Sequence, residues 1–568
     1  MPWPPVRLDH SGSAISLHQR LCASQSPNAF SLRLPVYSNL NIAVWRAALA
    51  SYHDAVVVDF LEFGWPINYV SPQPPAPVRQ NHPSALQHPS DVNSFIAKEV
   101  SLSATAGPFQ ANPLSCSLML SPLLTVPKKE STSRRIVMDL SFPPEQSVNS
   151  GIPTDTYLGE PYKLRLPGVD ALVALVQAFG SGSLLFKKDL RRAYRQLPID
   201  PRDYHFMGYS WDNLIFFDTV FAFGLRTAAM ACQRSTNCVT YLFSQQGFSC
   251  TNYIDDFGGC DTPDRAFEAF HQLQNLFLEL GLESSPEKDS PPATTMIFLG
   301  ILFNTVDMTL SIPSAKIQEL LDRIQQLIHS RRIAYHDLQS LLGLMSFVTA
   351  CVHPARIFMS SLLNGLRGVR PNQYLPISLE IKADLQWWLK FLVRFNGVSI
   401  IPSPTFTPDV LFTDACLSGV GGHFRNQCFH AQFPDAIVSL HHYNINVKEL
   451  LAIIVALRLW GSHMQGSRIL LRSDNLDAVQ AINNRRSRSP MVQQCLRVIW
   501  YICASYDMDL HAEHIPGYCN VAADLLSRWG SDSTASAAFF DLPAFADYTF
   551  VDCSQQMFDL SYDITDIC

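Results

Sequence analysis

The feature that most constrains this chain is a pair of adjacent acids, Asp255 and Asp256, set between apolar residues. Residues 251–257 alternate in a way that predicts two strands joined by a tight turn. Only such a turn lets both carboxylates face one site, because neighbouring side chains on a strand point to opposite faces. Taken alone, paired acids in a hairpin turn are more often solvated turn residues than metal ligands.

A third acid changes this interpretation. Asp189 ends another apolar segment, residues 183–190, which we expect to be a strand. Three carboxylates on neighbouring strands are what two divalent ions need in order to hold both the attacking and the leaving oxygen of a phosphoryl transfer. The sequence therefore predicts a metal site formed by Asp189, Asp255 and Asp256.

The composition favours a folded chain of several domains. It has 568 residues, of which 47% are hydrophobic and 16% charged, too many for a single core. The fourteen cysteines show no C-x-x-C spacing, which is typical of reduced, intracellular thiols. No signal peptide and no run of membrane-span length is recognisable. We expect an intracellular protein, cytoplasmic or nuclear, without a membrane partner.

The net charge of −7 does not exclude a nucleic-acid partner. Residues 530–568 contain seven Asp and no Lys or Arg, so residues 1–529 are neutral overall. A neutral body that concentrates its acids at metal sites can still present basic patches to phosphates. We interpret residues 530–568 as an acidic tail outside any enzyme domain.

Three segments near the paired acids allow two interpretations each. Residues 123–140 predict a hairpin with a basic tip, either a solvated edge hairpin or a triphosphate grip by Lys128 and Arg135. Five cations at residues 187–195 surround Asp189. They form either a solvated helix face or a binding site for a phosphate-rich substrate. A turn at Phe223 and Gly224 is followed by a helix of small residues. Small side chains either let a substrate approach the backbone closely or let the helix pack tightly against its neighbours.

In this order, the motifs resemble those of a retroelement reverse transcriptase. Residues 281–288 and 298–303 are similar to the family's fourth motif and its primer-grip hairpin, so the resemblance covers residues 123–303. It implies a right-hand polymerase with two Mg²⁺ ions, or Mn²⁺ as the alternative, on the three acids. It also implies Tyr194 as the aromatic gate against a 2′-hydroxyl, and a substrate-binding set of Lys128, Arg135, Tyr194, Phe223, Gly224, Gln233 and Lys288. Ala229 stands where many relatives have Pro.

Residues 409–529 alternate strands and helices and carry an acid at each of four elements. A single acid at a strand end is usually the N-cap of the next helix. Together the four resemble the RNase H fold, whose carboxylates bind two metal ions. The matching residues are Asp414, Glu449, Asp474 and Asp524, and His514 resembles a mobile histidine of some members. The basic residues 485–488 are either a solvated loop or a contact for the hybrid backbone.

The predicted fold class is an α+β and α/β multidomain chain, a right-hand polymerase (fingers, palm and thumb) followed by an RNase H-like domain. The predicted boundaries are an N-terminal extension with a Pro-rich linker (1–85), fingers and palm (86–312), thumb or connection helices (313–402), the RNase H-like domain (403–529) and the acidic tail (530–568). Residues 1–40 are weakly patterned and expected to be partly disordered, and the aromatics of the thumb are expected in its core.

The predicted function is RNA- and DNA-templated DNA synthesis with RNase H cleavage of RNA in RNA–DNA hybrids, copying a retrotransposon. The residues of these motifs most resemble those of the DIRS-type group, and Ty3-like elements are the alternative lineage. The expected partners are an RNA template, a DNA primer, the hybrid, dNTPs, an element-encoded Gag-like protein and a tyrosine recombinase. The alternatives are a host-retained, non-catalytic nucleic-acid-binding relic and an RNA-dependent RNA polymerase.

Overall fold

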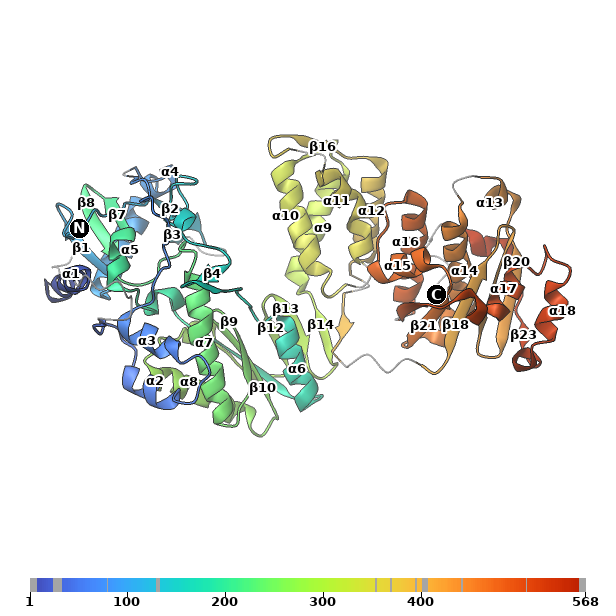
Figure 1. Ribbon diagram of the computed structural model, residues 1–568, viewed down its shortest axis with the longest axis horizontal. Helices are drawn as coiled ribbons and strands as arrows, with labels where there is room; N and C mark the ends of the chain where they lie inside the picture. The colour runs from blue at the N-terminus through green and yellow to red at the C-terminus, as the bar shows by residue number, and fades with distance from the viewer. Residues whose placement is uncertain are drawn as a thin grey trace. The chain divides into compact units, whose positions relative to one another are not determined.

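The computed structural model describes residues 8–23, 33–78, 80–128, 133–352, 355–367, 370–393, 396–400, 407–440, 443–506 and 508–560 (Figure 1). The chain divides into two compact units. The first comprises Met1–Leu299 with Asn304–Asp307, and the second comprises Gly300–Phe303 with Met308–Cys568. Both contain helices and sheets, so the expected mixed α+β and α/β fold class is confirmed.

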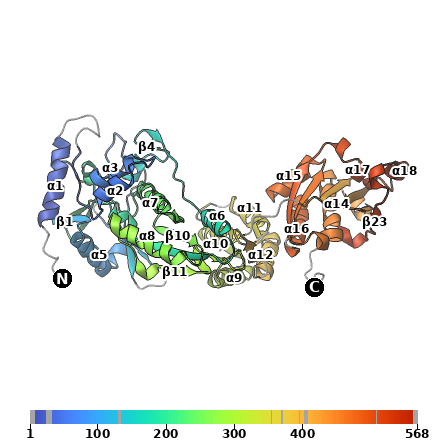
Figure 2. The same cartoon turned by 90° about the horizontal axis from the view of Figure 1, so that it is seen from below.

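The first unit is built around a four-stranded antiparallel sheet in the order β11-β6-β10-β9. Its strands are β6 (Leu184–Asp189), β9 (Cys250–Tyr253), β10 (Asp256–Asp261) and β11 (Ser290–Ala293). The helices of this half are α6 (Val169–Phe179), α7 (Ala228–Gln245) and α8 (Ala266–Leu280), which lie beside the sheet in two views (Figures 1 and 2). The predicted strand–turn–strand at residues 251–257 is therefore confirmed.

The remainder of the first unit supplies the predicted basic hairpin, β2 (Leu123–Pro127) with β3 (Arg134–Met138), whose tip at 129–132 lies outside the described residues. A second sheet has the order β1-β8-β7. Its strands are β1 (Thr105–Phe109), β7 (Gly208–Trp211) and β8 (Leu214–Asp218), and the helices that contact it are α1 (Leu8–Ala23) and α5 (Pro89–Ser101). Helix α4 (Pro83–Leu86) contacts β2, whereas α2 (Ile42–Ala48) contacts α3 (Val56–Phe63) and α8. The short strands β4 (Thr156–Tyr157) and β5 (Glu160–Pro161) pair with each other.

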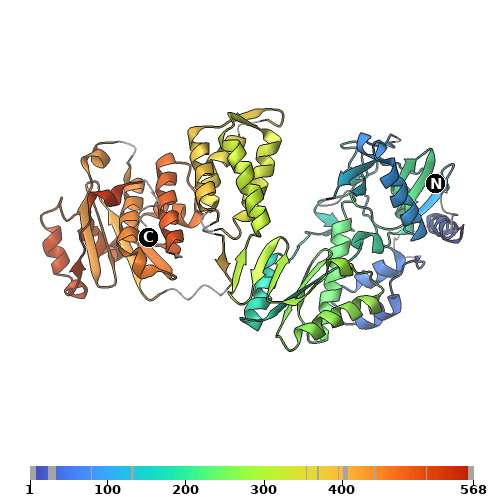
Figure 3. The same cartoon turned by 180° about the vertical axis from the view of Figure 1, so that it is seen from behind.

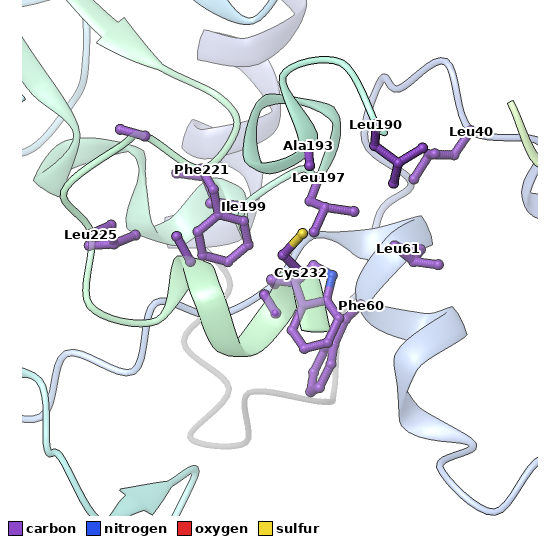
Figure 4. Close-up of a cluster of buried hydrophobic side chains, with 14 of the residues drawn as sticks. Leu40, Phe60, Leu61, Leu190, Ala193, Leu197, Ile199, Phe221, Leu225 and Cys232 are labelled. Carbon is purple, nitrogen blue, oxygen red and sulfur yellow. The ribbon is translucent and has the colours of Figure 1, made fainter. Parts of the chain in front are cut away.

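One continuous apolar core joins these elements. Figure 4 shows part of it, in which Leu197 lies beside Cys232, Phe60 lies below them, and Leu190 lies beside Leu40. The segment that follows Asp189 is thus part of the core that it shares with α3 and α7. Residues 187–195 are the end of β6 followed by a 3-10 turn, η2 (Ala193–Gln196), and not a helix face as one interpretation required.

The second unit contains helices at the positions predicted for the thumb: α9 (Ser314–Ile328), α10 (Tyr335–Val348), α11 (Ser360–Arg367) and α12 (Leu379–Phe391). The short strands β15 (Arg332–Ala334) and β16 (Tyr374–Pro376) pair antiparallel, as do β14 (Thr309–Ser311) and β17 (Val398–Ser399). Trp387 and Trp388 are buried, and Trp387 stacks on Phe358 with ring centroids 4.0 Å apart. These aromatics are core residues, as predicted. The predicted boundary at 402–405 lies outside the described residues.

The rest of the second unit is a six-stranded sheet in the order β22-β21-β18-β19-β20-β23 (Figure 3). The strands β18 (Val410–Ala415), β19 (Gly419–Phe424) and β20 (Gln427–Gln432) form an antiparallel meander, and β21 (Arg468–Ser473) and β22 (Asp509–His514) run parallel to β18. The helices are α13 (Asp435–Ser439), α14 (Ile445–Trp460), α15 (Leu476–Asn484), α16 (Pro490–Ser505), α17 (Val521–Ser527) and α18 (Ala535–Phe540).

Two terminal segments differ from the prediction. Residues 8–23 form helix α1, whereas residues 1–7 and 24–32 lie outside the described part of the chain. Residues 535–560 are not a separate tail, because β23 (Thr549–Phe550) pairs with β20 and Phe539 is fully buried against Leu526. The scattered aromatics of this acidic segment, which we interpreted as part of a tail, pack in the structure against α17 and β20.

This packing predicts a stability difference between two adjacent phenylalanines. Phe539 is 0% exposed and Phe540 is 63% exposed. Deleting a buried ring costs about 3–5 kcal/mol of unfolding free energy, so Phe539→Ala should lower the Tm of the second unit by about 5–10 °C. Phe540→Ala is the matched control and should change it little. Calorimetry of both variants checks this, and equal shifts would contradict the packed arrangement of residues 535–560.

Candidate active sites

The first site lies where β6 ends and β10 begins. Asp189 and Asp256 are direct partners in the ladder between these strands, and Asp255 occupies the turn that precedes β10. Ile254 in the same turn has φ 57°, a left-handed conformation that is unusual for a β-branched residue. Its backbone N–H donates to Oε1 of buried Gln233 on α7 at 2.8 Å. Gln233 therefore holds the strained turn that presents Asp255.

Burial and neighbouring charges shift the pKa of two acids of this site, Asp255 and Asp189. Burial raises the pKa of Asp255 to about 6, and the charges of Asp189 and Asp256 add to this effect. Burial also raises the pKa of Asp189, although Lys288 Nζ lies 2.9 Å from its Oδ1 and opposes the shift. Lys187 Nζ lies 2.7 Å from Asp256 Oδ1. Two lysines thus partly neutralise a cluster of three acids.

A cleft of about 710 Å³ opens beside Asp255. The predicted substrate residues that line it are Lys128, Arg135, Tyr194, Phe223 and Lys288. The Arg135 guanidinium lies 5.3 Å from the Phe223 ring, and the Phe223 and Tyr194 rings are 5.1 Å apart. Burial raises the pKa of Tyr194 to about 12, so its hydroxyl stays protonated at neutral pH. Exposed cations, aromatic rings and an acid therefore meet in one cleft.

Gly224 shapes the cleft from behind rather than lining it. Its φ is +107°, and a Cβ placed there would lie 2.4 Å from the carbonyl oxygen of Met138. Only glycine fits this position without backbone movement. The Gly224 carbonyl accepts a hydrogen bond from Asn149 Nδ2 at 2.7 Å. This close approach to β3 sets Phe223 beside Arg135, which is itself a residue of β3.

The other cations near Asp189 are engaged by acids. Lys188 is buried, and its Nζ lies 2.7 Å from Asp289 Oδ2. Arg195 is buried between Glu99 and Asp218. These residues are therefore structural ion pairs rather than a solvated face or an open phosphate seat. Sequence reasoning missed Glu99 and Asp218, because ion pairs between distant segments leave no local pattern.

The second site brings three predicted acids together. Asp414 on β18, Glu449 on α14 and Asp474 after β21 place ligand oxygens within 4.8 Å of one another. Burial raises the pKa of Glu449 to about 9, and the neighbouring acids Asp414 and Asp474 add to the shift. Burial likewise raises the pKa of Asp414 to about 7. Within the described residues, no other group of three acids, histidines or cysteines has its ligand atoms so close together. The acids of the first site do not meet this distance either.

The donor set of this second site fits a divalent cation. Glu449 Oε2 is buried without a hydrogen-bond partner, and a buried carboxylate oxygen in that state is costly. Carboxylate oxygens are the ligands that hard divalent ions such as Mg²⁺ and Mn²⁺ prefer. A cation among Asp414, Glu449 and Asp474 would satisfy this atom and offset the repulsion between the acids.

The remaining two predicted residues of this site lie at its border. Asp524 on α17 is half-exposed and pairs with Arg528 at 2.7 Å, and its charge raises the pKa of both Asp414 and Glu449. The approach of α17 depends on Gly421 of β19, where a Cβ would lie 2.4 Å from Leu526 Cβ. The exposed His514 places Nε2 3.2 Å from the carbonyl oxygen of Asp474. Both are therefore adjacent to the group of three acids without belonging to it.

The basic residues 485–488 divide between the two predicted roles. Arg485 has φ 53° and packs over the Trp500 ring, 4.1 Å from its centroid. Arg486 and Arg488 are exposed. Arg485 is thus a structural residue. Arg486 and Arg488 are exposed to solvent, and for them both interpretations, a solvated loop or a contact for the hybrid backbone, still apply.

Comparison with known proteins gives a family match for the part of the chain that contains the second site. Residues 412–530 match the protein-family model described as "Reverse transcriptase-like". The chain is 23% identical over 386 residues to the "Enzymatic polyprotein" of Carnation etched ring virus, covering 64% of this chain and 53% of that protein. It is 22% identical over 432 residues to the "Transposon Tf2-3 polyprotein" of Schizosaccharomyces pombe (strain 972 / ATCC 24843), covering 72% of this chain and 29% of the relative.

The chain thus spans about half of the first relative and under a third of the second. Among solved structures it is similar to a foamy viral protease-reverse transcriptase in complex with ds DNA, with TM-score 0.49, 16% identity and coverage of 87% of this chain and 84% of that one. A second structure, of the foamy viral protein with RNA/DNA hybrid, gives TM-score 0.47 at 16% identity and covers 86% of this chain and 64% of that one. Residues 412–530 are a reverse transcriptase-like domain, in a chain that has retroelement polyproteins among its relatives.

Proposed function

We propose that this chain is a reverse transcriptase with RNase H activity, which copies RNA and DNA templates into DNA and cleaves the RNA of RNA–DNA hybrids. The observation that carries the proposal is the presence of two separate acid sites in one chain. One borders a cleft of about 710 Å³ lined by cations and aromatic rings. The other gathers three acids within 4.8 Å on an RNase H-like sheet.

In the first site, Asp189, Asp255 and Asp256 would hold two Mg²⁺ ions, with Mn²⁺ as the alternative. The ions would polarise the phosphoryl group and lower the pKa of the attacking hydroxyl. Lys128 and Arg135 are exposed in the cleft and suited to bind a triphosphate. Lys288 keeps its proton, since its pKa is raised by Asp189 although burial opposes this. It contributes a positive charge beside the acids.

In the second site, Asp414, Glu449, Asp474 and Asp524 would hold two such ions, which supply a hydroxide nucleophile for RNA hydrolysis. The exposed His514 ring lies beside Asp474 and can accept or donate a proton at the solvent side. No helix of the described part of the chain combines the length and the apolar character that a membrane span requires. The proposed partners are an RNA template, a DNA primer, the hybrid and dNTPs.

The proposal extends to the biological setting. The motif wording of residues 253–257 and 514–528 supports a retrotransposon of the DIRS-type group. A Gag-like protein and a tyrosine recombinase encoded by the same element would then be partners. The rival function, a non-catalytic relic that binds nucleic acid, predicts no turnover at either site. The two acid sets and the cations of the cleft favour catalysis over it.

The first prediction concerns the palm acids. Asp255→Asn should reduce primer extension on an RNA template by at least about a hundredfold, because a lost metal ligand costs several kcal/mol of transition-state stabilisation. Asp212→Asn is the matched control. It changes an acid with φ 48° in the β7–β8 turn, a conformation that Asn also tolerates. Extension by Asp255→Asn above about a hundredth of the wild-type rate would rule out the ligand role.

The second prediction concerns metal binding by the second site. In EDTA at pH 8, Glu449→Gln should unfold at the wild-type temperature or above it, because the raised pKa of Glu449 makes its charged form costly in the folded state. That cost is absent below pH about 4.5 and grows as the pH rises toward 9. Adding Mg²⁺ should raise the Tm of wild type more than that of Glu449→Gln. Equal Mg²⁺ shifts in both proteins, measured by calorimetry, would argue against a cation at these acids.

The third prediction concerns sugar selection. A rigid ring at Tyr194, packed against Phe223, would exclude a 2′-hydroxyl by steric contact. Tyr194→Ala should raise incorporation of ribonucleotides relative to deoxynucleotides by at least about tenfold, equal to about 1.4 kcal/mol. The ratio of kcat/KM for the two sugars measures this. An unchanged ratio would remove Tyr194 from this role and favour the RNA polymerase alternative.

A further inference from the structure

A single buried carboxylate connects both ends of the turn that carries Tyr194. Glu99, on α5, is 2% exposed. Its Oε2 accepts hydrogen bonds from Arg192 Nη2 at 2.7 Å and from Arg195 Nε at 2.8 Å. These arginines flank Tyr194 on its two sides, at the start and within η2. One oxygen atom therefore fixes the chain before and after the ring.

Arg195, which follows Tyr194, is itself held by further hydrogen bonds. Arg195 Nη2 donates to Asp218 Oδ1 and to Thr105 Oγ1, both at 3.1 Å, and Nη1 also donates to Asp218. Asp218 ends β8, and Thr105 begins β1. Since Arg195 is buried and bonded on every nitrogen, it ties the turn to the β1–β8 sheet as well as to α5.

The backbone at Arg192, at the start of the turn, requires such a restraint. Arg192 has φ 53° and ψ 39°, a left-handed conformation that a residue with a side chain adopts only at an energetic cost. Strained backbone of this kind persists where the surroundings over-determine it. The charged pair with Glu99 supplies that restraint. Burial alone would raise the pKa of Glu99, but the guanidinium groups of Arg195 and Arg192 lower it below the ordinary value.

This cluster of Glu99, Arg192 and Arg195 borders the cleft together with Tyr194. Steric exclusion of a hydroxyl group works only when the excluding ring cannot retreat, and displacement by about 1 Å is enough to cost specificity. Phe223 restricts the Tyr194 ring from one side. Glu99 restricts the backbone below it, because it holds both flanking residues.

We propose that Glu99 is a positioning residue for sugar discrimination, which sets the place of Tyr194 through Arg192 and Arg195 without touching the nucleotide. The inference rests on the proposed polymerase function and deepens it. It assigns a role to α5, for which the sequence offered no chemistry. Loss of the Glu99 charge frees the Tyr194 turn, so ribonucleotides enter more readily, while the palm acids keep their geometry.

The experiment compares kcat/KM for dNTP and for the matching rNTP in the full-length chain. Glu99→Gln should lower the preference for deoxynucleotides by about fivefold or more. In a Tyr194→Ala background the same change should have no further effect, because the ring that it positions is gone. Asp54→Asn is the control. It breaks a two-bond pair with Arg234, at 2.8 Å for each bond, away from the cleft, and should leave the preference unchanged.

A second variant guards against misfolding of Glu99→Gln. Arg192→Gln leaves all three hydrogen-bond partners of Arg195 in place and releases only the start of the turn. It should therefore lower the sugar preference in a protein with a near-normal Tm. An unchanged preference in folded, active variants, or an equal loss in the Tyr194→Ala background, would overturn the inference. Absence of primer extension by wild type would instead overturn the proposed function, and this inference with it.

Discussion

Mutual repulsion between carboxylates is the constraint on which both sites depend. At the second site, burial and neighbouring acids raise the pKa of Glu449 to about 9 and that of Asp414 to about 7. At the first site, burial and the charges of Asp189 and Asp256 raise the pKa of Asp255 to about 6, and Lys288 opposes this shift. Lys187 and Lys288 lie within 2.9 Å of Asp256 and Asp189. Like charges in a low dielectric separate unless the backbone holds them or an opposite charge joins them. The fold provides the backbone restraint. The clustered carboxylates are suited to bind a cation, which would provide the opposite charge.

The backbone meets this constraint with specific contacts. Gln233 bonds the strained turn at Ile254 that presents Asp255. Gly421 lets α17 approach β19 so closely that Asp524 reaches the border of the second site. Gly224 sets Phe223 against Arg135 on the opposite wall of the cleft. Each of these contacts joins segments that are distant in sequence, and each fixes the position of a charged or aromatic group.

Sequence reasoning located what depends on local pattern and missed what depends on distant partners. The alternation at residues 251–257 was sufficient to predict the hairpin of β9 and β10, and the sequence predicted helices where α9 to α12 lie. Gln233 was expected to bind substrate. That role stays a prediction, but its observed bonds are to Ile254 in the turn, to Asn252 on β9 and to Asn237 on α7. Glu99 carries no local signal at all, since its meaning comes from two arginines over ninety residues away. The seven Asp of residues 530–568 favoured a solvated tail, whereas the aromatics of residues 535–560 pack against the sheet, a contact with residues distant in sequence.

The central claim is that one chain holds two independent metal-dependent activities. The most direct test measures primer extension and RNA cleavage of a labelled RNA–DNA hybrid on single preparations of wild type, Asp255→Asn and Glu449→Gln. The account predicts complementary losses. Asp255→Asn should lose extension and keep cleavage, and Glu449→Gln should lose cleavage and keep extension near the wild-type rate. Loss of both activities in either folded variant, or of neither, would contradict it.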